Sequence, residues 1–362
     1  MSTYLILANN SGGLYGFRHE LIEELLKRGE VVASTPFDDK MELLRGTGCK
    51  LIETSFDRRG KNLFADISLL FEYIRMIRRL HPDSVLTYTI KPNLYGGLAS
   101  RITKTPYFAN ITGLGSIFEK QGFLQMCVRL LYIIALKRAK AVFFENKANM
   151  ELFINTGMIN SKQAYLLSGA GVNLERFSYK EYPKNEVFRF LFMGRIMKEK
   201  GIDELLEAMR RLNSDKLVCT LDILGKMNED YTQVLDAAQK TGYIFYHGVK
   251  EDVRPYIETA DCFVLPSWHE GMANTNLECA ASGRPIITSN IPGCKEAVIE
   301  SVSGLLCDPK NVNSLYEKMK LMIQMSRRDR EVMGIAGRNH MEAEFDKEKV
   351  VQMTIDTIRS SI

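Results

Sequence analysis

Short β-branched or aromatic runs alternate with amphipathic helical stretches from one end of this chain to the other. This alternation is typical of parallel sheets covered by helices on both faces. The first half contains the expected strands Tyr4–Ala8, Val31–Ser34, Leu51–Thr54, Ser84–Thr89, Tyr107–Asn110, Ala141–Phe144 and Ala164–Leu167. A second series follows at Phe190–Met193, Leu217–Leu224, Tyr243–Tyr246, Cys262–Leu265, Pro285–Thr288 and Gly304–Leu306. The sequence therefore predicts an α/β protein with two doubly wound sheets.

The length of 362 residues supports two domains, because single hydrophobic cores stop growing at about 250–300 residues. Between the two strand series, the polar stretch Ser178–Glu186 contains Pro183 and interrupts the periodicity. We therefore place one Rossmann-like domain at residues 1–177 and a second at residues 187–345, facing each other across a cleft. The apolar spacing of residues 346–362 predicts a last helix, and we expect it to cross back and pack on the first domain.

Charge and cysteine content narrow the cellular setting. A formal charge of +4 is too small to indicate nucleic acid as a partner. The seven cysteines include no C-x-x-C pair, which favours a reducing compartment with most thiols buried. The N-terminus reads as a strand rather than a signal peptide, and the longest apolar stretch, Phe123–Leu136, falls short of the roughly 20 residues that span a bilayer. We therefore expect a cytoplasmic protein.

Basic and apolar residues interleave in one part of the first half. The basic members are Arg58, Arg59, Lys61, Arg75, Arg78 and Arg79. Two interpretations stay open, a solvated helix face and a patch attracted to an anionic membrane surface. The stretch Phe123–Ala139 is more typical of a buried helix with a basic end, so we prefer the region around Arg58–Arg79 for membrane contact. We expect peripheral attachment on the inner face of the cell membrane.

The strongest local signal follows the expected strand Phe190–Met193. Gly194 and Arg195 end that strand, and Lys200 and Gly201 open the next helix. In open α/β sheets ligands bind beyond the carboxyl ends of strands, where a helix N-terminus and basic side chains suit a phosphate. So short a pattern also fits an ordinary surface loop, and it needs support from elsewhere in the domain.

That support comes from a pair of glutamates. Glu270 falls in the loop after Cys262–Leu265, and Glu278 lies eight positions later inside the next helix. Carboxylates in this arrangement can accept hydrogen bonds from hydroxyl groups along an extended polar ligand, one from a sugar and one from a ribose. The amides of Gly271–Thr275 would then meet the phosphates between them.

Together these residues resemble the donor domain of the retaining family 4 glycosyltransferases, which have the GT-B fold. The resemblance covers nearly the whole second half in an ordered series: Gly194-Arg195, Lys200-Gly201, Gly225, Gly248, Asp252-Val253, Ala260–Ser267, Glu270-Gly271, Glu278, Gly283 with Pro285, Gly293 with Glu296, and Gly304-Leu305. It implies that Arg195 and Lys200 bind the nucleotide diphosphate. By the same resemblance Glu270 contacts the donor sugar and Glu278 the ribose, and we take Arg195, Lys200 and Glu270 as catalytic candidates. The other expected donor-binding residues are Gly194, Gly225, His269, Gly271, Met272, Ala273 and Asn274.

The first half is more loosely similar to bacterial capsule and oligosaccharide enzymes that extend a sugar on undecaprenyl diphosphate, among them N-acetylgalactosaminyltransferases. The similarity implies a lipid-linked saccharide as acceptor and a glycine loop at Ser11–Arg18 on the acceptor side. The expected acceptor-side residues are Gly12, Gly13, Tyr15, Arg18, Lys91, Asn93, Gly113 and Ser116. Many family members place a histidine after the strand that ends near Asn110. This chain has Ile111-Thr112-Gly113 there, so that donor contact must come from other groups.

Other functions fit less well or stay open. The Gly12-Gly13 pair gives no full G-x-G-x-x-G, which disfavours a nicotinamide enzyme. No Asp-x-Asp stands in a strand-end loop, so we expect no metal and no cofactor, only a nucleotide sugar that the resemblance suggests is UDP-linked. No carboxylate is evidently placed as a nucleophile, and we expect retention by front-side attack. The alternatives are a GT-B sugar-nucleotide epimerase or hydrolase, and a non-catalytic sugar-nucleotide binding protein.

Overall fold

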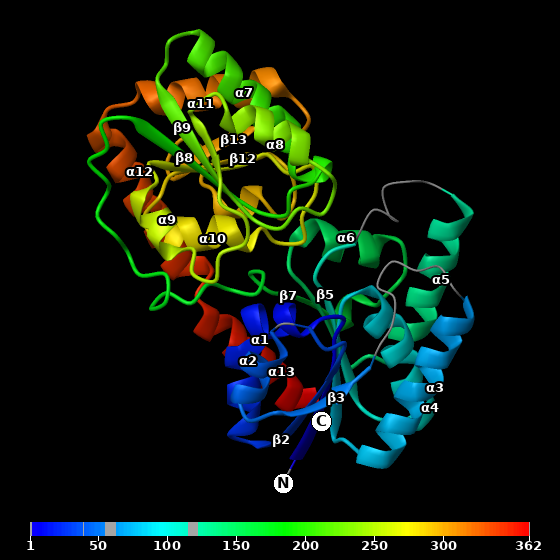
Figure 1. The fold of residues 1–362 in the computed structure, drawn as a ribbon. Coiled ribbons are helices and arrows are strands. Elements are labelled where there is room, and N and C mark those ends of the chain that lie inside the picture. The colour runs from blue at the N-terminus through cyan, green and yellow to red at the C-terminus, as the bar shows by residue number, and fades with distance from the viewer. Residues whose placement is uncertain (1, 39, 55–62, 115–121, 362) are drawn as a thin grey trace. The chain divides into compact units, whose positions relative to one another are not determined.

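The computed structural model describes residues 2–38, 40–54, 63–114 and 122–361. Two parallel sheets organise the chain into two units, Met1–Ala170 with Lys347–Ile362, and Gly171–Asp346 (Figure 1). In both sheets every paired strand within the described ranges is parallel to its neighbour, which matches the α/β architecture that the alternating pattern predicts. Four residues singled out in the sequence lie outside the described residues: Arg58, Arg59 and Lys61 of the basic stretch, and Ser116 of the acceptor side.

The first sheet has the strand order β3-β2-β1-β4-β5-β6-β7, so the order reverses between β1 and β4. Its strands are β1 (Ser2–Leu7), β2 (Gly29–Thr35), β3 (Lys50–Glu53), β4 (Ser84–Tyr88), β5 (Tyr107–Ile111), β6 (Ala141–Phe144) and β7 (Ala164–Leu166). The helices are α1 (Ser11–Leu26), α2 (Met41–Gly46), α3 (Leu63–Leu80), the π-helical turn η1 (Pro92–Gly96), α4 (Gly97–Thr103), α5 (Phe123–Leu136), α6 (Lys147–Asn155), the 3-10 turn η3 (Ser161–Gln163) and α13 (Lys347–Ser361).

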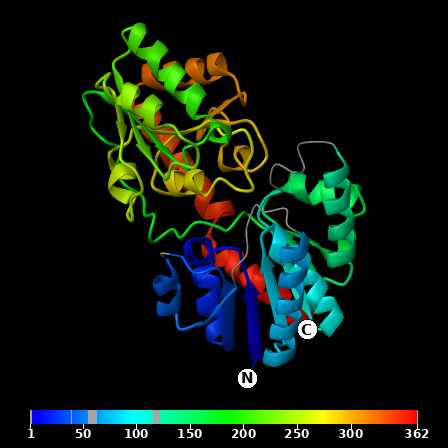
Figure 2. The ribbon, with the colours of Figure 1, turned by 45° about the vertical axis from the view of Figure 1, so that its right-hand side comes forward.

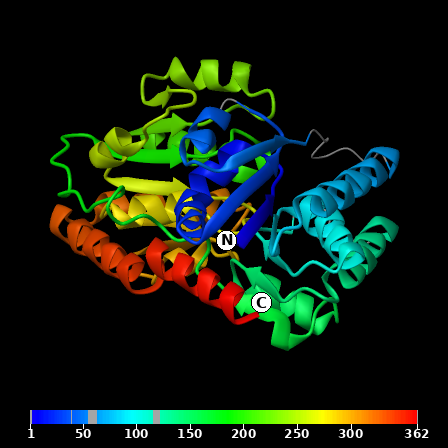
Figure 3. The ribbon, with the colours of Figure 1, turned by 90° about the horizontal axis from the view of Figure 1, so that it is seen from below.

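Helices cover both faces of this sheet (Figure 2). On one face α3, α4, α5 and α6 pack on alternate strand residues such as Leu5, Val85 and Val142. On the other face α1, α2 and α13 pack on the intervening residues, such as Ile6 and Leu86. Helix α13 lies beside α1 (Figure 3), because its apolar residues recur at helical spacing and face this layer. Its buried apolar members are Val350, Val351, Ile355 and Ile358.

The second sheet has the order β10-β9-β8-β11-β12-β13. Its strands are β8 (Phe188–Met193), β9 (Cys219–Leu224), β10 (Ile244–Tyr246), β11 (Cys262–Leu265), β12 (Ile286–Ser289) and β13 (Gly304–Cys307). The helices are the 3-10 turn η4 (Lys198–Lys200), α7 (Ile202–Ser214), α8 (Thr232–Gln239), α9 (Arg254–Thr259), α10 (Asn274–Ala281), the 3-10 turn η5 (Lys295–Ala297), α11 (Val312–Gln324) and α12 (Arg327–Glu344). The central strands of this sheet are buried on both faces, so their sequences are continuous apolar runs. These runs are the pattern from which the strands were predicted.

The boundary between the units differs from the predicted one. The first unit ends at Ala170 rather than at residue 177, because the following residues bond within the second unit. The Val172 amide donates to the Phe345 carbonyl at 2.7 Å. The expected linker Ser178–Glu186 is also held there, since Arg284 donates to the carbonyl of Lys180 at 2.7 Å. Proline and charge in this stretch therefore mark an extended surface segment of the second unit.

The glycine loop expected at Ser11–Arg18 is helical. Helix α1 begins at Ser11, and the Asn10 side chain caps it by accepting a hydrogen bond from the Gly13 amide. Glycine is tolerated in a first helical turn, and the capping asparagine specifies the helix start. The buried residues of α1, among them Leu14 and Leu21, follow at helical spacing.

The sequence also predicted mostly buried thiols and no helix that crosses a membrane. All seven cysteines are free, and every one except the half-buried Cys127 is buried, as predicted. No helix in the described ranges is both long and apolar enough to cross a membrane.

Candidate functional site

The order of the second sheet reverses between the neighbouring strands β8 and β11. In doubly wound sheets such a reversal lets the two following loops diverge, and ligands bind in the opening at the carboxyl ends of the strands. Lys200 follows β8 and Glu270 follows β11. The fold therefore carries two of the predicted site residues to the one position on this sheet where a ligand is expected.

Lys200 and Glu270 form a close ion pair. The Lys200 ammonium donates to Oε1 of Glu270, and both side chains are largely buried. The Ser267 hydroxyl donates to the same carboxylate oxygen at 2.9 Å. Two donors on one oxygen fix the orientation of the carboxylate and leave its other oxygen to accept from a ligand.

Further contacts join the loop after β8 to the loop after β11. The Trp268 amide donates to the Glu199 carbonyl at 2.9 Å, and Nε2 of His269 lies 3.2 Å from Oε2 of Glu199. The Trp268 indole donates to Oε1 of Glu204 in α7 at 3.1 Å. The positions of Lys200 and Glu270 are thus set by a network of backbone and side-chain bonds around them.

Close backbone approach explains two of the glycines. Gly201 has a φ of +72°, and a Cβ built on it would lie 2.8 Å from the carbonyl carbon of Pro266. Gly225, with a φ of +143°, packs in the same way on the Gly194 carbonyl at the neighbouring loop. Because only glycine combines these conformations with so little space, the loops after β8, β9 and β11 can lie against one another.

Helix α10 presents its N-terminus at this edge of the sheet. Its N-cap residue is Ala273, which has no side-chain oxygen to satisfy the first helical amides. The Ala273 amide itself donates to the Gly293 carbonyl at 2.7 Å, which fixes the start of the helix. An N-terminus of this kind suits an anion through its amides and its positive dipole end.

The remaining predicted donor residues lie around this centre. Arg195 is exposed after β8, and Glu278 is half-buried within α10. Met272 and Ala273 are buried, so they can offer only backbone groups to a ligand, and Asn274 is half-buried at the first turn of α10. The structure therefore pairs Lys200 with Glu270 and joins His269 to Glu199, the residue before Lys200. Arg195 lies in the loop after β8, and Glu278 lies in the second turn of α10.

Sequence reasoning missed Ser267, Glu199 and Glu204 as parts of the site. Ser267 could have been found, because it is a polar residue two positions after the buried strand β11 and three positions before Glu270. Cys294 also lies near the glutamate. Burial first, and the Glu270 charge second, raise the pKa of the Cys294 thiol well above its usual range, so this cysteine stays neutral and packs as a hydrophobe.

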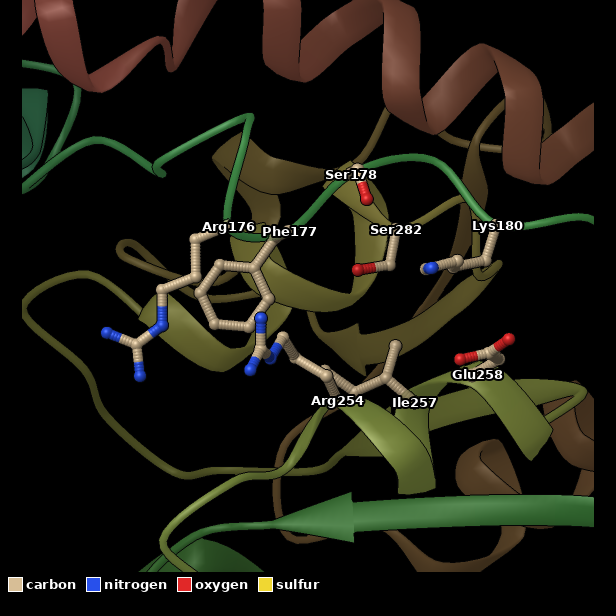
Figure 4. Close-up of a pocket in the computed structure, with 8 residues that line it drawn as sticks. All are labelled: Arg176, Phe177, Ser178, Lys180, Arg254, Ile257, Glu258 and Ser282. Carbon is tan, nitrogen blue, oxygen red and sulfur yellow. The ribbon is translucent and has the colours of Figure 1, made fainter.

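A separate small pocket lies elsewhere on the second unit (Figure 4). Its basic lining residues are Arg176, Lys180 and Arg254, from the segment before β8 and from α9. Arg254 is already paired with Asp252 at 2.8 Å. None of the predicted donor residues lines this pocket.

On the first unit, Arg18 lies in a buried ion pair. Its Nη2 is 2.5 Å from Oε1 of Glu145, and its guanidinium lies over the Tyr88 ring at 5.1 Å from the centroid. Burial raises the pKa of Glu145, although the Arg18 charge opposes this. Lys347 at the start of α13 donates to the Phe17 carbonyl at 3.2 Å. This group ties α1, β4, β6 and α13 together at the carboxyl edge of the sheet.

Two other predicted acceptor-side residues, Lys91 and Asn93, make contacts within the first unit. Lys91 pairs with Asp66 of α3 at 2.7 Å. Asn93 is fully buried, where it accepts from the Thr87 hydroxyl at 2.6 Å and donates to the Asn110 carbonyl at 2.9 Å. Asn93 therefore joins β4 to β5 and cannot touch an acceptor directly. Its partners belong to two different strands, whose pairing the sequence does not show locally.

The other acceptor-side candidates lie near the carboxyl edge. Gly12, Gly13 and Tyr15 belong to the first turns of α1, and Gly113 follows β5. Ser116 lies outside the described residues. Among the residues that the structure describes, no group of three or more His, Cys, Asp or Glu side chains is placed to hold a metal ion.

Comparison with known proteins identifies the family. Residues 175–340 match the family model for glycosyl transferases group 1, and residues 5–146 match that for glycosyl transferase 4-like proteins. The chain is 31% identical over 336 residues to the N,N'-diacetylbacillosaminyl-diphospho-undecaprenol alpha-1,3-N-acetylgalactosaminyltransferase of Campylobacter jejuni, with 88% of each chain covered. The chain belongs to the family 4 glycosyltransferases. Its two parallel sheets are the two halves of the GT-B fold.

Two more distant relatives of this family 4 glycosyltransferase are informative. It is 25% identical over 279 residues to the UDP-Gal:alpha-D-GlcNAc-diphosphoundecaprenol alpha-1,3-galactosyltransferase of Escherichia coli, with 72% of this chain and 71% of that enzyme covered. The structure of Anabaena Alr3699/HepE in complex with UDP-glucose has a TM-score of 0.83, at 17% identity over 99% of this chain and 100% of the other. That structural likeness establishes the GT-B fold predicted from the sequence.

Proposed function

We propose that this glycosyltransferase moves a hexose or N-acetylhexosamine, with retention, from a UDP-sugar to a lipid-diphosphate-linked saccharide in bacterial surface polysaccharide or glycan assembly. The names of the Campylobacter and Escherichia relatives, both of which specify diphospho-undecaprenol-linked acceptors, support the acceptor class. The name of the Escherichia relative supports UDP as the carrier. The observation that carries the donor site is the Lys200–Glu270–Ser267 cluster at the reversal of the second sheet.

The roles follow from the charges at that edge. Lys200, Arg195 and the amides at the start of α10 would bind the diphosphate and stabilise the charge that develops as it leaves. Glu270 would accept hydrogen bonds from sugar hydroxyl groups through the oxygen that Lys200 and Ser267 do not occupy. Glu278 on α10 would accept from the ribose.

Retention is proposed to occur by front-side attack. The acceptor hydroxyl attacks the anomeric carbon on the face from which the UDP leaves, the bond to the diphosphate oxygen breaks, and that oxygen takes the acceptor proton. The Glu270 carboxylate is engaged by two donors, and Cys294 is a buried neutral thiol, so neither is suited to act as a nucleophile. Product NMR should show the anomeric configuration of the donor. A trapped glycosyl-enzyme intermediate would contradict this mechanism.

We further propose that transfer needs no divalent metal and takes place at the inner face of the cell membrane, with nucleic acid playing no part. The absence of an Asp-x-Asp in the strand-end loops supports metal independence. EDTA should leave the initial rate unchanged, whereas a rate that falls with EDTA and returns with Mg²⁺ or Mn²⁺ would refute this part of the proposal.

The deciding experiment is a donor screen. A UDP-sugar present at 100 times its Kd should stabilise the protein by about 2.7 kcal/mol in thermal unfolding. The donors that stabilise are then incubated with an undecaprenyl-diphosphate saccharide and, separately, without acceptor. Transfer that requires the acceptor supports the proposal. Epimerisation or rapid hydrolysis without acceptor would favour the alternative enzyme class, and binding without any turnover would favour a binding protein.

A further inference from the structure

Two helices of the first unit expose large apolar side chains along one stripe each. On α3, Phe64 is 85% and Phe71 60% exposed, with Ile67 between them. On α5, Met126 is 62% and Leu130 56% exposed, followed by Ile133 and Ile134. Spacings of three, four and seven residues place each set on a single outward face. Such clustering exceeds the scattered exposed apolar residues that any protein surface carries, and it marks an interaction surface.

The two stripes lie on helices that cover the same face of the sheet. Helices α3 and α5 both pack with α4 on that face, and the three stand together in Figures 1 and 3. Each connects parallel strands, so each runs back from the carboxyl edge of the sheet and begins at that edge. The exposed apolar residues of α3 lie in its N-terminal half, whereas those of α5 extend from Met126 in its first turn to Ile134 near its end. The stripes therefore start beside the sheet edge that carries Arg18, Glu145 and Tyr88.

Each apolar stripe continues into basic residues. Along α3 the exposed face passes from Phe71 to Arg75 and Arg78, and along α5 it passes from Ile134 to Lys137 and Arg138. The nearby acid Asp66 is paired with Lys91. The combined face is therefore apolar over one part and cationic over the other. It complements an anionic bilayer, where side chains such as Phe and Leu enter the interface and Arg and Lys meet the headgroups.

We propose that the outer faces of α3 and α5 together form the surface by which this protein docks on an anionic lipid bilayer, with their exposed apolar side chains inserted into the interface. This inference rests on the proposed function only in that the acceptor is lipid-linked. It also revises the expectation that α5 is merely a buried helix with a basic end. The N-terminal halves of both helices lie at the sheet edge that holds the acceptor-side residues, which would bring a membrane-held diphosphate to that edge.

The test compares variants in vesicle co-sedimentation. The wild-type protein should bind to vesicles of phosphatidylcholine with phosphatidylglycerol. It should bind much more weakly to vesicles of phosphatidylcholine alone. Phe71→Ser, Met126→Ser and Leu130→Ser combined should weaken binding at least tenfold. Arg78→Gln should weaken it about fivefold, and only on anionic vesicles. The matched control is Val218→Ser with Val332→Ser, which are 68% and 58% exposed on the second unit and should change nothing.

Activity separates docking from damage to the site. The triple variant should lose transfer to an acceptor embedded in vesicles but keep transfer to a short-chain, water-soluble acceptor, with unchanged thermal unfolding. Equal loss with both acceptors would overturn the proposal, as would vesicle binding by the triple variant at the wild-type level. Light scattering that shows a dimer for the wild type and a monomer for the triple variant would also overturn it. Vesicle binding is measured without donor or acceptor. It therefore tests the docking surface even if the proposed transfer reaction fails.

Discussion

Replacing Gly201 by alanine tests whether close packing of two loops creates the donor site. Gly201 and Gly242 both have positive φ, at +72° and +80°, so alanine at either position adopts a left-handed conformation at about 1–2 kcal/mol. A Cβ at Gly242 meets nothing within 4 Å, whereas one at Gly201 lies 2.8 Å from the Pro266 carbonyl carbon. Gly201→Ala therefore adds a steric cost of about 1–3 kcal/mol, which has to be relieved by moving the loop that carries Glu270.

The two variants should consequently separate in stability and in binding. At roughly 2–4 °C per kcal/mol, Gly242→Ala should lower Tm by about 2–8 °C, and Gly201→Ala by several degrees more. UDP binding can be followed by the fluorescence of Trp268, the only tryptophan, which is bonded to Glu199 and Glu204. Gly201→Ala should weaken UDP binding at least tenfold while Gly242→Ala binds normally. Equal Tm values and equal UDP affinity in the two variants would refute the reasoning.

Three further substitutions test individual contacts. Glu270→Gln should reduce transfer at least tenfold, about 1.4 kcal/mol, yet bind UDP as tightly as wild type or more tightly, because Lys200 is released toward phosphate; full transfer activity would remove Glu270 from the mechanism. Asn93→Ala should cost about 2–4 kcal/mol in urea unfolding by stranding Thr87 and Asn110, and an unchanged stability with a raised acceptor KM would reverse that assignment. Although burial opposes it, hydrogen bonds from Ser11, Lys40 and Gly12 hold the pKa of Asp38 below its usual value. The advantage of wild type over Asp38→Asn in unfolding free energy should therefore be complete at pH 7 and fade only as pH falls below about 4, whereas a difference that grows in acid would contradict it.

The strands and most helices follow from local periodicity, which is why the sequence predicted them well. Strands such as Ala141–Phe144 and Cys262–Leu265 coincide with the observed β6 and β11, because four buried residues in a row leave little choice of boundary. The first turns of helix α1 were missed because Gly12 and Gly13 indicate a turn. The side chain that decides for a helix is Asn10, and its capping bond to Gly13 is visible only in three dimensions.

The candidate site was predictable as a set of residues and not as a set of bonds. Gly194, Lys200 and Glu270 stand in loops after strand ends and Glu278 in the next helix, and the sequence shows that much. The pairing of Lys200 with Glu270 joins residues 70 positions apart, and it depends on strand order, which the sequence does not encode locally. The burial of Asn93 is hidden for the same reason, since its partners Thr87 and Asn110 belong to two different strands.

The Lys200–Glu270 pair suggests how the proposed diphosphate site stays stable when empty. A largely buried lysine without a partner would lose its hydration at a cost of several kcal/mol or give up its proton. Glu270 removes that cost in the free protein, while its second oxygen stays available for the sugar. When the diphosphate arrives, Lys200 can share its remaining protons with phosphate without leaving Glu270, because an ammonium has three donors. The same pair can then bind the leaving group and the transferred sugar together, so its geometry couples donor binding to the position of the bond that breaks.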